Sequence, residues 1–402
     1  MKSARRAGQT FKTSASHLMA EQLRFLTKRL LLHSVRYCSP NAANGKTMTR
    51  QILAQRIKER ARAMGFTGAA IVPATPAEHA RYYRAWLEAG YHAEMAYLAR
   101  PDAVARRANM ARTVPNAQSV VVVTANYHTQ HLPPSILNDP SRGIIASYAW
   151  GVDYHDLLTP RLYELQAWIA SQVEDPLHGR AYVDTGPVLE RALAARGGLG
   201  FIGKNTCLID PLRGSYLFVG EIILDCPLPF DAPSPRGTCG RCTRCLSACP
   251  TGAFPAPHTL DSRLCISYLT IELKGEIPVA LRPKLGNRIF GCDICQEVCP
   301  YNRRFAMPTD EPAFRATLER AAPPLLELVA LDEAGFRERF RGSPVRRAKR
   351  RGLLRNVCVA LGNWGDPAAI PALQRARHDP EPLIRHHAAW ALAQIAARRA
   401  KS

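Results

Sequence analysis

Hydrophobic and polar positions follow two different periods between residues 49 and 230. Ile52, Ile57, Ala61 and Met64 recur at the spacing of one helix face, and Gly65 ends that run. Short apolar runs bounded by turn residues predict strands at 68–72, 119–126, 180–184, 207–209 and 216–224. Further helices are expected at 76–89, 160–172 and 187–196. Because helices and strands alternate along the chain, we expect residues 48–230 to form an α/β domain.

The pattern changes twice after this domain. Residues 227–237 contain four prolines, which predicts a linker into a cysteine-rich region at 231–310. Near the C-terminus, apolar positions predict helices at 353–361, 368–376 and 383–397, with Asp-Pro turns between them. Such helix pairs resemble HEAT repeats, although a generic helical hairpin gives the same pattern. One or two units cannot stand alone, so we expect residues 311–402 to dock on the rest of the chain.

Length and charge narrow the class of protein. The 402 residues suffice for two or three domains, and no apolar stretch approaches the roughly 18 residues of a membrane span. Of the net charge of +21, residues 1–50 contribute ten basic against one acidic residue, and residues 337–402 contribute fifteen against four. The basic C-terminal region predicts a polyanionic partner such as nucleic acid. A solvated arginine-rich helix face is the alternative.

The first 47 residues are basic and nearly free of acidic residues. Arg5-Arg6 is typical of a twin-arginine export signal, but Lys28 and Arg29 interrupt the apolar stretch that should follow. We expect residues 1–47 to be a disordered extension, or an artefact of a start assigned ahead of Met48.

Eight of the twelve cysteines lie between Cys239 and Cys299 in metal-ligand spacings, which indicates a reducing compartment, the cytoplasm. The first run, Cys239-x2-Cys242-x2-Cys245-x3-Cys249-Pro250, has the spacing of bacterial ferredoxins, in which the fourth cysteine binds a second 4Fe–4S cluster. The second run, Cys292-x2-Cys295-x3-Cys299-Pro300, has Ile289 where its first cysteine should stand. Cys265 is the obvious replacement.

We therefore assign Cys239, Cys242, Cys245 and Cys299 to one cluster, the first cysteine set. Cys249, Cys265, Cys292 and Cys295 form the second cysteine set. A pair of zinc ribbons would explain the two-residue gaps but not two x3-Cys-Pro endings. Cys38, Cys207, Cys226 and Cys358 have no such spacing, and we expect them to be small buried side chains.

Other cofactor motifs give no match. No G-x-G-x-x-G follows a strand, so nothing indicates a nicotinamide or flavin site. Asp153-Tyr154-His155 begins like the D-x-H-x-x-G motif that supplies a histidine to cobalamin, but Leu158 stands where the motif requires glycine.

Several strings together resemble the epoxyqueuosine reductase family, over roughly Thr49 to the C-terminus. They are Tyr182-Val183-Asp184-Thr185-Gly186-Pro187-Val188-Leu189-Glu190-Arg191, Gly203-Lys204-Asn205, Cys265-Ile266-Ser267-Tyr268-Leu269-Thr270, and Gly286-Asn287-Arg288 through Cys299-Pro300. The resemblance implies a cytoplasmic, cobalamin-dependent reductase that converts epoxyqueuosine to queuosine at the wobble position of tRNA. It also implies an α/β cobalamin-binding domain like that of reductive dehalogenases, without a histidine ligand to the cobalt.

In the family the aspartate of the V-D-[ST]-[AG]-P motif is the proton donor, and that position is Asp184. A carboxylic acid can protonate a leaving oxygen near neutral pH if its surroundings raise its pKa. Asp184 ends an apolar strand, so desolvation is plausible, although the following helix would favour the charged form. A helix-capping role is the alternative.

The resemblance extends to weaker candidates. Lys204 and Asn205 lie in a glycine-rich turn that could meet cobalamin, and an ordinary turn with an exposed lysine is equally consistent. The further candidates for cobalamin contacts are Arg112, Tyr127, Tyr154 and Asp184 itself. The basic set expected to contact tRNA phosphates is Arg346, Arg347, Lys349, Arg350, Arg351 and Arg355.

These features predict a monomer in which an external low-potential donor feeds electrons through the clusters. Two rivals share some of them. A reductive dehalogenase would use the same redox groups on a small halogenated substrate, which the basic helical tail disfavours. A non-catalytic electron carrier would need no domain as large as residues 48–230.

Overall fold

The structure is a computed structural model that describes residues 49–75, 78–234 and 237–400. The chain divides into two compact units, Met1–Tyr37 and Cys38–Ser402, and every described residue belongs to the second. The expectations for residues 1–47 and for Cys38 therefore lie outside the described residues.

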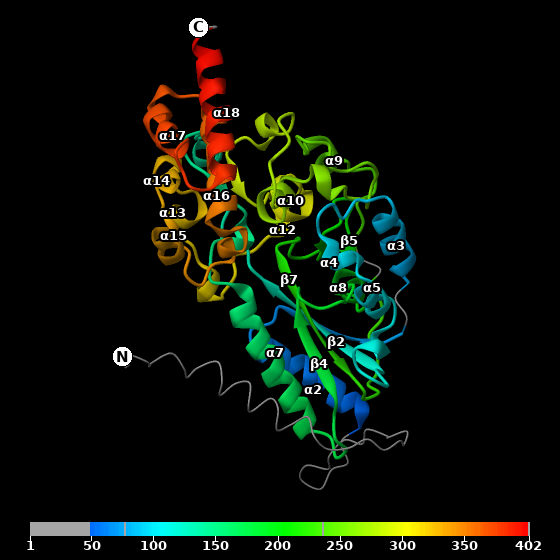
Figure 1. The fold of residues 1–402 in the computed structure, drawn as a ribbon. Coiled ribbons are helices and arrows are strands. Elements are labelled where there is room, and N and C mark those ends of the chain that lie inside the picture. Colours follow the sequence, from blue (N-terminus) through cyan, green and yellow to red (C-terminus); the bar gives the residue numbers. More distant parts are fainter. Residues whose placement is uncertain (1–48, 76–77, 235–236, 401–402) are drawn as a thin grey trace, which may run out of the picture. The chain divides into compact units, whose positions relative to one another are not determined.

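A four-stranded sheet forms the centre of the α/β domain (Figure 1). Its spatial order is β1 (Gly68–Pro73), β2 (Ser119–Asn126), β7 (Leu217–Leu224) and β4 (Gly179–Val183). Alternating elements commonly build a parallel sheet, but all three neighbouring pairs here are antiparallel. Pro73, the last residue of β1, pairs with Ser119, the first residue of β2. The segment that connects the two strands therefore begins and ends at the same end of the sheet.

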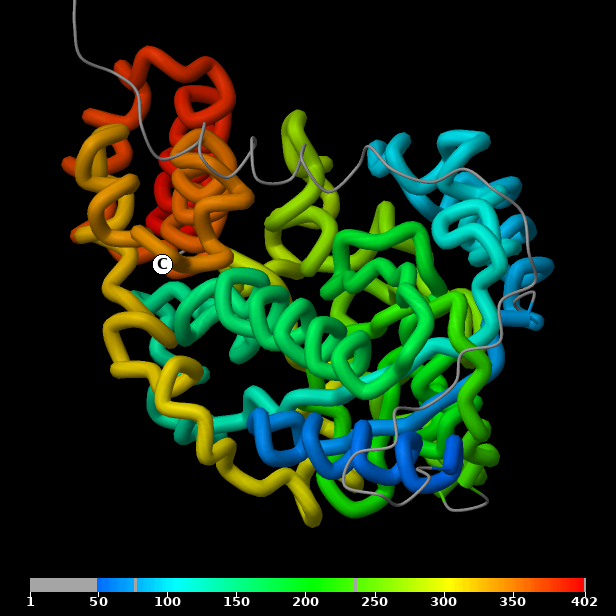
Figure 2. The backbone as a smooth tube through the Cα atoms, turned by 90° about the horizontal axis from the view of Figure 1, so that it is seen from below, coloured from blue at the N-terminus to red at the C-terminus, as the bar shows by residue number. Residues whose placement is uncertain are grey.

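Strand β2 is buried on both faces, which explains its uninterrupted apolar run. Val121 and Val123 pack with helices α2 (Arg50–Ala63) and α7 (Tyr154–Ser171). Val120 and Val122 point the other way, toward α8 (Glu190–Arg196). Figures 1 and 2 show α2 and α7 side by side along one face of the sheet. The other elements before the cysteine-rich region are α3 (Ala80–Glu88), α4 (Ala96–Ala99), α5 (Pro101–Ala108), η2 (Met110–Arg112), α6 (Pro134–Leu137), β3 (Ile144–Ile145), η3 (Ser147–Ala149), β5 (Phe201–Ile202) and β6 (Leu208–Ile209).

Two predicted helix starts were wrong because proline was taken as the first helical residue. Helix α7 begins at Tyr154, where the Asp153 side chain accepts a hydrogen bond from the backbone of His155, and Pro160 lies inside the helix. Helix α8 begins only at Glu190, after a loop that contains Pro187. This loop carries Asp184.

The proline-rich segment is anchored on the α/β domain at Asp231. The carboxylate of Asp231 accepts hydrogen bonds from Lys58 Nζ at 2.7 Å and from the backbone nitrogen of Ile71 at 2.9 Å.

The cysteine-rich region consists of short elements joined by loops. They are α9 (Arg244–Ala248), η4 (Ser262–Leu264), α10 (Ile266–Ile271), η5 (Arg282–Leu285), β8 (Arg288–Phe290), α11 (Ile294–Glu297) and α12 (Pro300–Phe305). Strand β8 pairs in parallel with β3, so backbone hydrogen bonds tie this region to the α/β domain.

The C-terminal region is helical, as predicted. Its elements are η6 (Pro312–Phe314), α13 (Leu318–Ala321), α14 (Leu325–Val329), α15 (Glu333–Arg339), η7 (Pro344–Ala348), α16 (Lys349–Trp364), η8 (Pro367–Ala369), α17 (Ile370–Ala376) and α18 (Pro382–Arg399). Helices α16 and α18 pack together (Figure 1). Gly365 ends α16 at a φ of 76°, a left-handed conformation that favours glycine. In the part of the chain that the structure describes, no helix has the length and apolar character to cross a bilayer.

Arg355 docks α16 on the cysteine-rich region and is 1% exposed. Its guanidinium donates to the carbonyl oxygens of Leu273, Gly275 and Leu269 at 2.8, 2.7 and 2.6 Å. Burial lowers the pKa of Arg355 to about 10, so it stays charged at neutral pH. This position contradicts the assignment of Arg355 to the basic set that contacts tRNA, because its donors are already used inside the protein.

We predict that Arg355→Ala destabilises the fold strongly. Three carbonyl groups, one of them fully buried, would lose their donor, and each unsatisfied buried group costs about 1–3 kcal/mol. Urea or thermal unfolding should show a loss of roughly 3–5 kcal/mol. The exposed Arg346→Ala is the matched control and should unfold like the wild-type chain. Equal stability of the two variants would contradict the docking role of Arg355.

Candidate active site

Asp184 lies at the tip of a tight turn directly after β4. Its φ is +58°, which is unusual for a residue other than glycine, and the backbone nitrogen of Thr185 donates to the carbonyl of Val183 at 2.6 Å. Glycine is required at position 186, because the Cβ of any other residue would lie only 2.4 Å from the Tyr182 ring. Strained turns of this kind concentrate at functional sites. Asp184 does not cap α8, whose N-cap residue is Leu189, so the alternative capping role is wrong.

The hydroxyl of Tyr154 donates a hydrogen bond to Asp184 Oδ2 at 2.7 Å. Tyr154 is buried, and this burial together with the negative charge of Asp184 raises the pKa of Tyr154 far above its usual value. The phenol therefore keeps its proton and holds one carboxylate oxygen in place. The Asp184 side chain itself is 51% exposed, so the protein alone does not supply the desolvation expected from the sequence.

Arg347, from η7 in the C-terminal region, faces the same carboxylate. Its Nη1 lies 3.9 Å from Asp184 Oδ2 and 3.8 Å from Glu272 Oε1. Burial acts to lower the pKa of Arg347, but the surrounding Tyr154, Asp184, Tyr148 and Glu272 raise it overall, so the guanidinium stays charged. The sequence placed Arg347 among the tRNA contacts, whereas the structure brings it to Asp184.

Sequence analysis missed Tyr97, Tyr148 and Glu190 at this site. Tyr97 on α4 is half exposed; burial and the charges of Glu272 and Asp184 raise its pKa to about 12. Tyr148 packs edge-on against Tyr154, with ring centroids 6.2 Å apart. These residues come from distant parts of the chain, and no spacing in the sequence connects them with Asp184.

The other candidates for cobalamin contacts divide into two groups. Tyr127 is buried against Phe218, with ring centroids 4.5 Å apart, and Phe218 stacks on Tyr154, with ring centroids 4.2 Å apart. Tyr127 and Tyr154 therefore belong to one aromatic layer. Arg112 is exposed in η2.

Lys204 and Asn205 instead hold the cysteine loops. Lys204 Nζ donates to the carbonyls of Gly240 and Cys242 at 2.8 and 3.0 Å. The Asn205 amide donates to the carbonyl of Cys295 at 3.3 Å. Both side chains are therefore engaged with the cysteine-rich region, and their contact with cobalamin stays a prediction.

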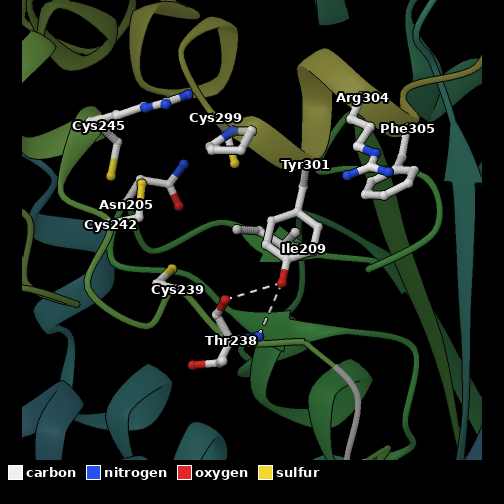
Figure 3. Close-up of a pocket in the computed structure, with 12 residues that line it drawn as sticks. Asn205, Ile209, Thr238, Cys239, Cys242, Cys245, Cys299, Tyr301, Arg304 and Phe305 are labelled. Carbon is white, nitrogen blue, oxygen red and sulfur yellow. Dashed lines mark hydrogen bonds between the residues drawn. The ribbon is translucent and has the colours of Figure 1, made fainter.

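The first cysteine set lines a cavity of about 360 Å³. Figure 3 shows Cys239, Cys242, Cys245 and Cys299 around one space, with Tyr301 and Arg304 on its rim. The Tyr301 hydroxyl bonds both the backbone nitrogen and the carbonyl of Thr238, at 3.2 and 3.1 Å, which joins the two runs. Four unpaired thiols thus converge from segments far apart in sequence.

The thiols of the second cysteine set lie near enough to affect one another's pKa. Burial raises the pKa of the Cys292 thiol to about 12, with a contribution from Cys265, and Cys249 adds to the burial that raises the pKa of Cys265. Ile289, at the position where a cysteine was missing, is fully buried in the apolar core. The chain uses that position for packing.

Cys207 lies beside the second set, which sequence analysis did not foresee. A hydrogen bond between the thiols of Cys207 and Cys295 lowers the pKa of Cys207 and raises that of Cys295. Cys358 is fully buried in the C-terminal core, as expected, and Cys226 is also buried.

The basic set is divided by the structure. Arg346, Lys349 and Arg351 are exposed. Arg350 is largely buried and paired with Asp379. Arg347 is also exposed although it faces Asp184, whereas Arg355 is buried in the core, so four of the six predicted residues lie on the surface.

Three family profiles match the chain. "Epoxyqueuosine reductase QueG, DUF1730" matches residues 107–185, "4Fe-4S double cluster binding domain" residues 238–302 and "HEAT repeats" residues 346–402. An epoxyqueuosine reductase of Pseudomonas aeruginosa is 45% identical over 350 residues, which cover 85% of this chain and 94% of the relative. One of Xanthomonas campestris pv. campestris is 45% identical over 344 residues, covering 85% and 96%. The chain belongs to the epoxyqueuosine reductase family.

Solved epoxyqueuosine reductases share the fold. A selenomethionine-labelled crystal structure aligns with a TM-score of 0.79 at 33% identity, covering 86% of this chain and 91% of the other. An epoxyqueuosine reductase in complex with an epoxyqueuosine-modified tRNA-Tyr stem loop aligns with a TM-score of 0.79 at 32% sequence identity, with the same coverage of both chains. In a Bacillus subtilis structure, an aspartate catalytic loop is swung out of the active site. This structure aligns with a TM-score of 0.78 at 32% sequence identity, covering 86% of this chain and 91% of the other. The predicted family, fold class and oxidoreductase class are confirmed, as is a 4Fe–4S double-cluster domain.

We predict that Cys265→Ala in this epoxyqueuosine reductase removes one cluster and leaves the other. Iron in the reconstituted protein should fall from about eight to about four atoms per chain, because each 4Fe–4S cluster requires its own four thiolates. The buried Cys358→Ala is the matched control and should keep full iron. Unchanged iron in the Cys265 variant would show that another group completes the second set.

Proposed function

We propose that this chain removes the epoxide oxygen of epoxyqueuosine at the wobble position of tRNA, giving queuosine. The observation that carries the proposal is Asp184, held by Tyr154 and faced by Arg347, in a chain that spans nearly all of its epoxyqueuosine reductase relatives. The reaction consumes two electrons and two protons and releases water. The chain must therefore supply a route for electrons and an acid at the epoxide oxygen.

The two cysteine sets, as assigned from the sequence, hold the clusters of this route. Each set takes its fourth ligand from the other run, since Cys299 completes the first and Cys249 joins the second. An external low-potential donor would deliver electrons to the exposed side of this region, where Arg304 and Tyr301 border the first set.

The residues around Tyr154 fit cobalamin. Among the described residues, buried side-chain atoms without a hydrogen-bond partner include Ser147 Oγ, His155 Nε2, Thr129 Oγ1 and His128 Nδ1. A corrin ring carries many amide groups that could pair with such atoms, and buried polar groups rarely stay unpaired. We propose that these atoms, with Tyr127 and Tyr154 of the aromatic layer, hold the cofactor. Bound there, cobalamin would supply the low-potential metal centre for the reduction.

In this proposal Asp184 protonates the epoxide oxygen. Tyr154 fixes one carboxylate oxygen and leaves the other toward the substrate, and the positive charge of Arg347 stabilises the carboxylate that remains after proton transfer. The tight turn at Asp184 also suits a movable loop, and the aspartate loop of the Bacillus subtilis relative is swung out of its active site.

The surface-exposed members of the basic set would contact tRNA. A relative binds a modified tRNA stem loop. Arg346 and Lys349 flank Arg347 on η7 and at the start of α16, so phosphates bound there would lie near Asp184.

We predict that Asp184→Asn lowers turnover by roughly 10²–10⁴, the usual cost of losing a general acid. Asn keeps the shape and the bond to Tyr154 but carries no acidic proton. Single-turnover reduction of an epoxyqueuosine-containing anticodon stem loop measures the effect, and metal analysis confirms that the variant is loaded.

Asp156→Asn, on the first turn of α7, is the matched control and should react at the wild-type rate. A fully loaded Asp184 variant with near wild-type turnover would remove Asp184 from the mechanism.

We further predict that Arg346→Gln with Lys349→Gln weakens stem-loop binding and reduces its log–log salt slope by about one per lost phosphate contact. Fluorescence titration at several salt concentrations measures both. Arg375→Gln on α17 is the control for the loss of a surface charge at another place. A double variant with the wild-type affinity and slope would mean that this face is only solvated.

A further inference from the structure

Two glutamates near Asp184, one fully buried and one half-buried, are not used in the proton transfer described above. Glu221, in the middle of β7, is 0% exposed, and neither of its carboxyl oxygens has a hydrogen-bond partner. Glu190 is the first residue of α8; its carboxyl accepts a hydrogen bond from the backbone N–H of Asp184, while its Oε1 is buried and unpartnered. Unpartnered buried carboxyl oxygens are costly and call for an explanation.

The register of the sheet places the pair on one face. Glu221 stands opposite Tyr182 of β4 and opposite Val122 of β2, and this face of the sheet is covered by α8. Directly opposed residues of antiparallel strands point to the same side. Glu221 and Glu190 therefore lie together between the sheet and α8, and the turn of Asp184 lies two residues beyond Tyr182.

Burial, with a smaller contribution from neighbouring carboxylates, raises the pKa of both glutamates. Burial raises the pKa of Glu190 to about 8; Asp184 raises it further, and Arg191 and Arg107 act in the opposite direction. Burial, then Glu190 and Asp184, raise the pKa of Glu221 well above its usual range. At neutral pH the pair carries protons that no hydrogen bond of the fold requires.

The chemistry needs one proton more than Asp184 holds. Removal of an epoxide oxygen as water, with formation of a carbon–carbon double bond, takes up two electrons and two protons. Asp184 delivers one proton and is left as a carboxylate. A second proton must reach the same oxygen before water leaves.

We propose that Glu190 and Glu221 form a proton reservoir that protonates Asp184 again during each turnover. The O–H bond of Glu190 breaks, the Asp184 carboxylate gains the proton, and Glu221 then supplies Glu190. No electrons move in these steps. Solvent refills the pair afterwards through Asp184, which is half exposed. Both glutamates act through Asp184 and touch no reacting atom, so they are positioning residues, and the inference rests on the proposed function.

Infrared spectroscopy of the substrate-free, reconstituted wild-type chain tests the stored proton directly. A protonated carboxyl band should be present at neutral pH, and the part of it that comes from Glu190 should be lost as pH rises through about 8, the pKa of Glu190. The protonated carboxyl band should be weaker in the Glu190→Gln variant and in the Glu221→Gln variant, because each variant lacks one of the two carboxyl groups. The exposed Glu164→Gln is the matched control and should leave the band unchanged. Absence of the band from the wild-type chain at neutral pH would overturn the proposal, even if both variants failed to fold.

Single-turnover rates over a range of pH test the delivery. The wild-type rate should fall as pH rises through about 8, because Glu190 then loses its proton. Glu190→Gln should react roughly 10- to 100-fold slower near neutral pH, at or below the cost of a lost general acid. It should lack the step near pH 8, because the group that titrates there is gone.

A loaded Glu190→Gln chain with the wild-type pH profile would overturn the reservoir and leave the proposed function standing. A wild-type chain that shows the band but reduces no epoxyqueuosine would refute the function, and the role of the reservoir with it.

Discussion

The buried guanidinium of Arg355 is the interaction on which the arrangement of the site depends. It binds three carbonyl groups of the segment 269–275 and so fixes α16 against the cysteine-rich region. Helix α16 follows η7 directly, and η7 carries Arg347 to Asp184. The same segment also carries Glu272, the second partner of Arg347. The C-terminal helices thus complete the active site of the α/β domain, in addition to presenting a basic surface.

The cysteine spacing predicted more than any other part of the sequence. Ligand spacing in iron–sulfur proteins is set by the size of the cluster, so the runs identify the cofactor without knowledge of the fold. Cys265 was found because only one other cysteine lay between the runs. The structure adds the reason for the gap, since Ile289 is part of the apolar core. Helix and strand positions were also predictable, because burial on one or two faces leaves a periodic pattern.

The active site was predictable only where a motif marked it. Asp184 was found by resemblance, and its turn conformation was not foreseen because Pro187 suggested an earlier helix start. Arg347 and Arg355 look alike in the sequence, as neighbouring arginines of a basic helix, yet one faces a carboxylate and the other is buried. Tertiary contacts determine which arginine is buried and which faces a carboxylate, and a count of charges along the sequence contains no information on those contacts. Glu221 is a single acidic residue in an apolar strand, and its surroundings come from β2, β4 and α8.

The exchange of ligands between the two cysteine runs affects how the protein is made. With the sets we propose, the first is incomplete until Cys299 has left the ribosome, and the second until Cys295 has. No cluster can be fully coordinated while the nascent chain ends before α11. The α/β domain has by then been synthesised, and the residues from Pro300 onward still have to follow. Cluster insertion must therefore come late in biosynthesis, onto a chain whose eight thiols have all stayed reduced until that moment.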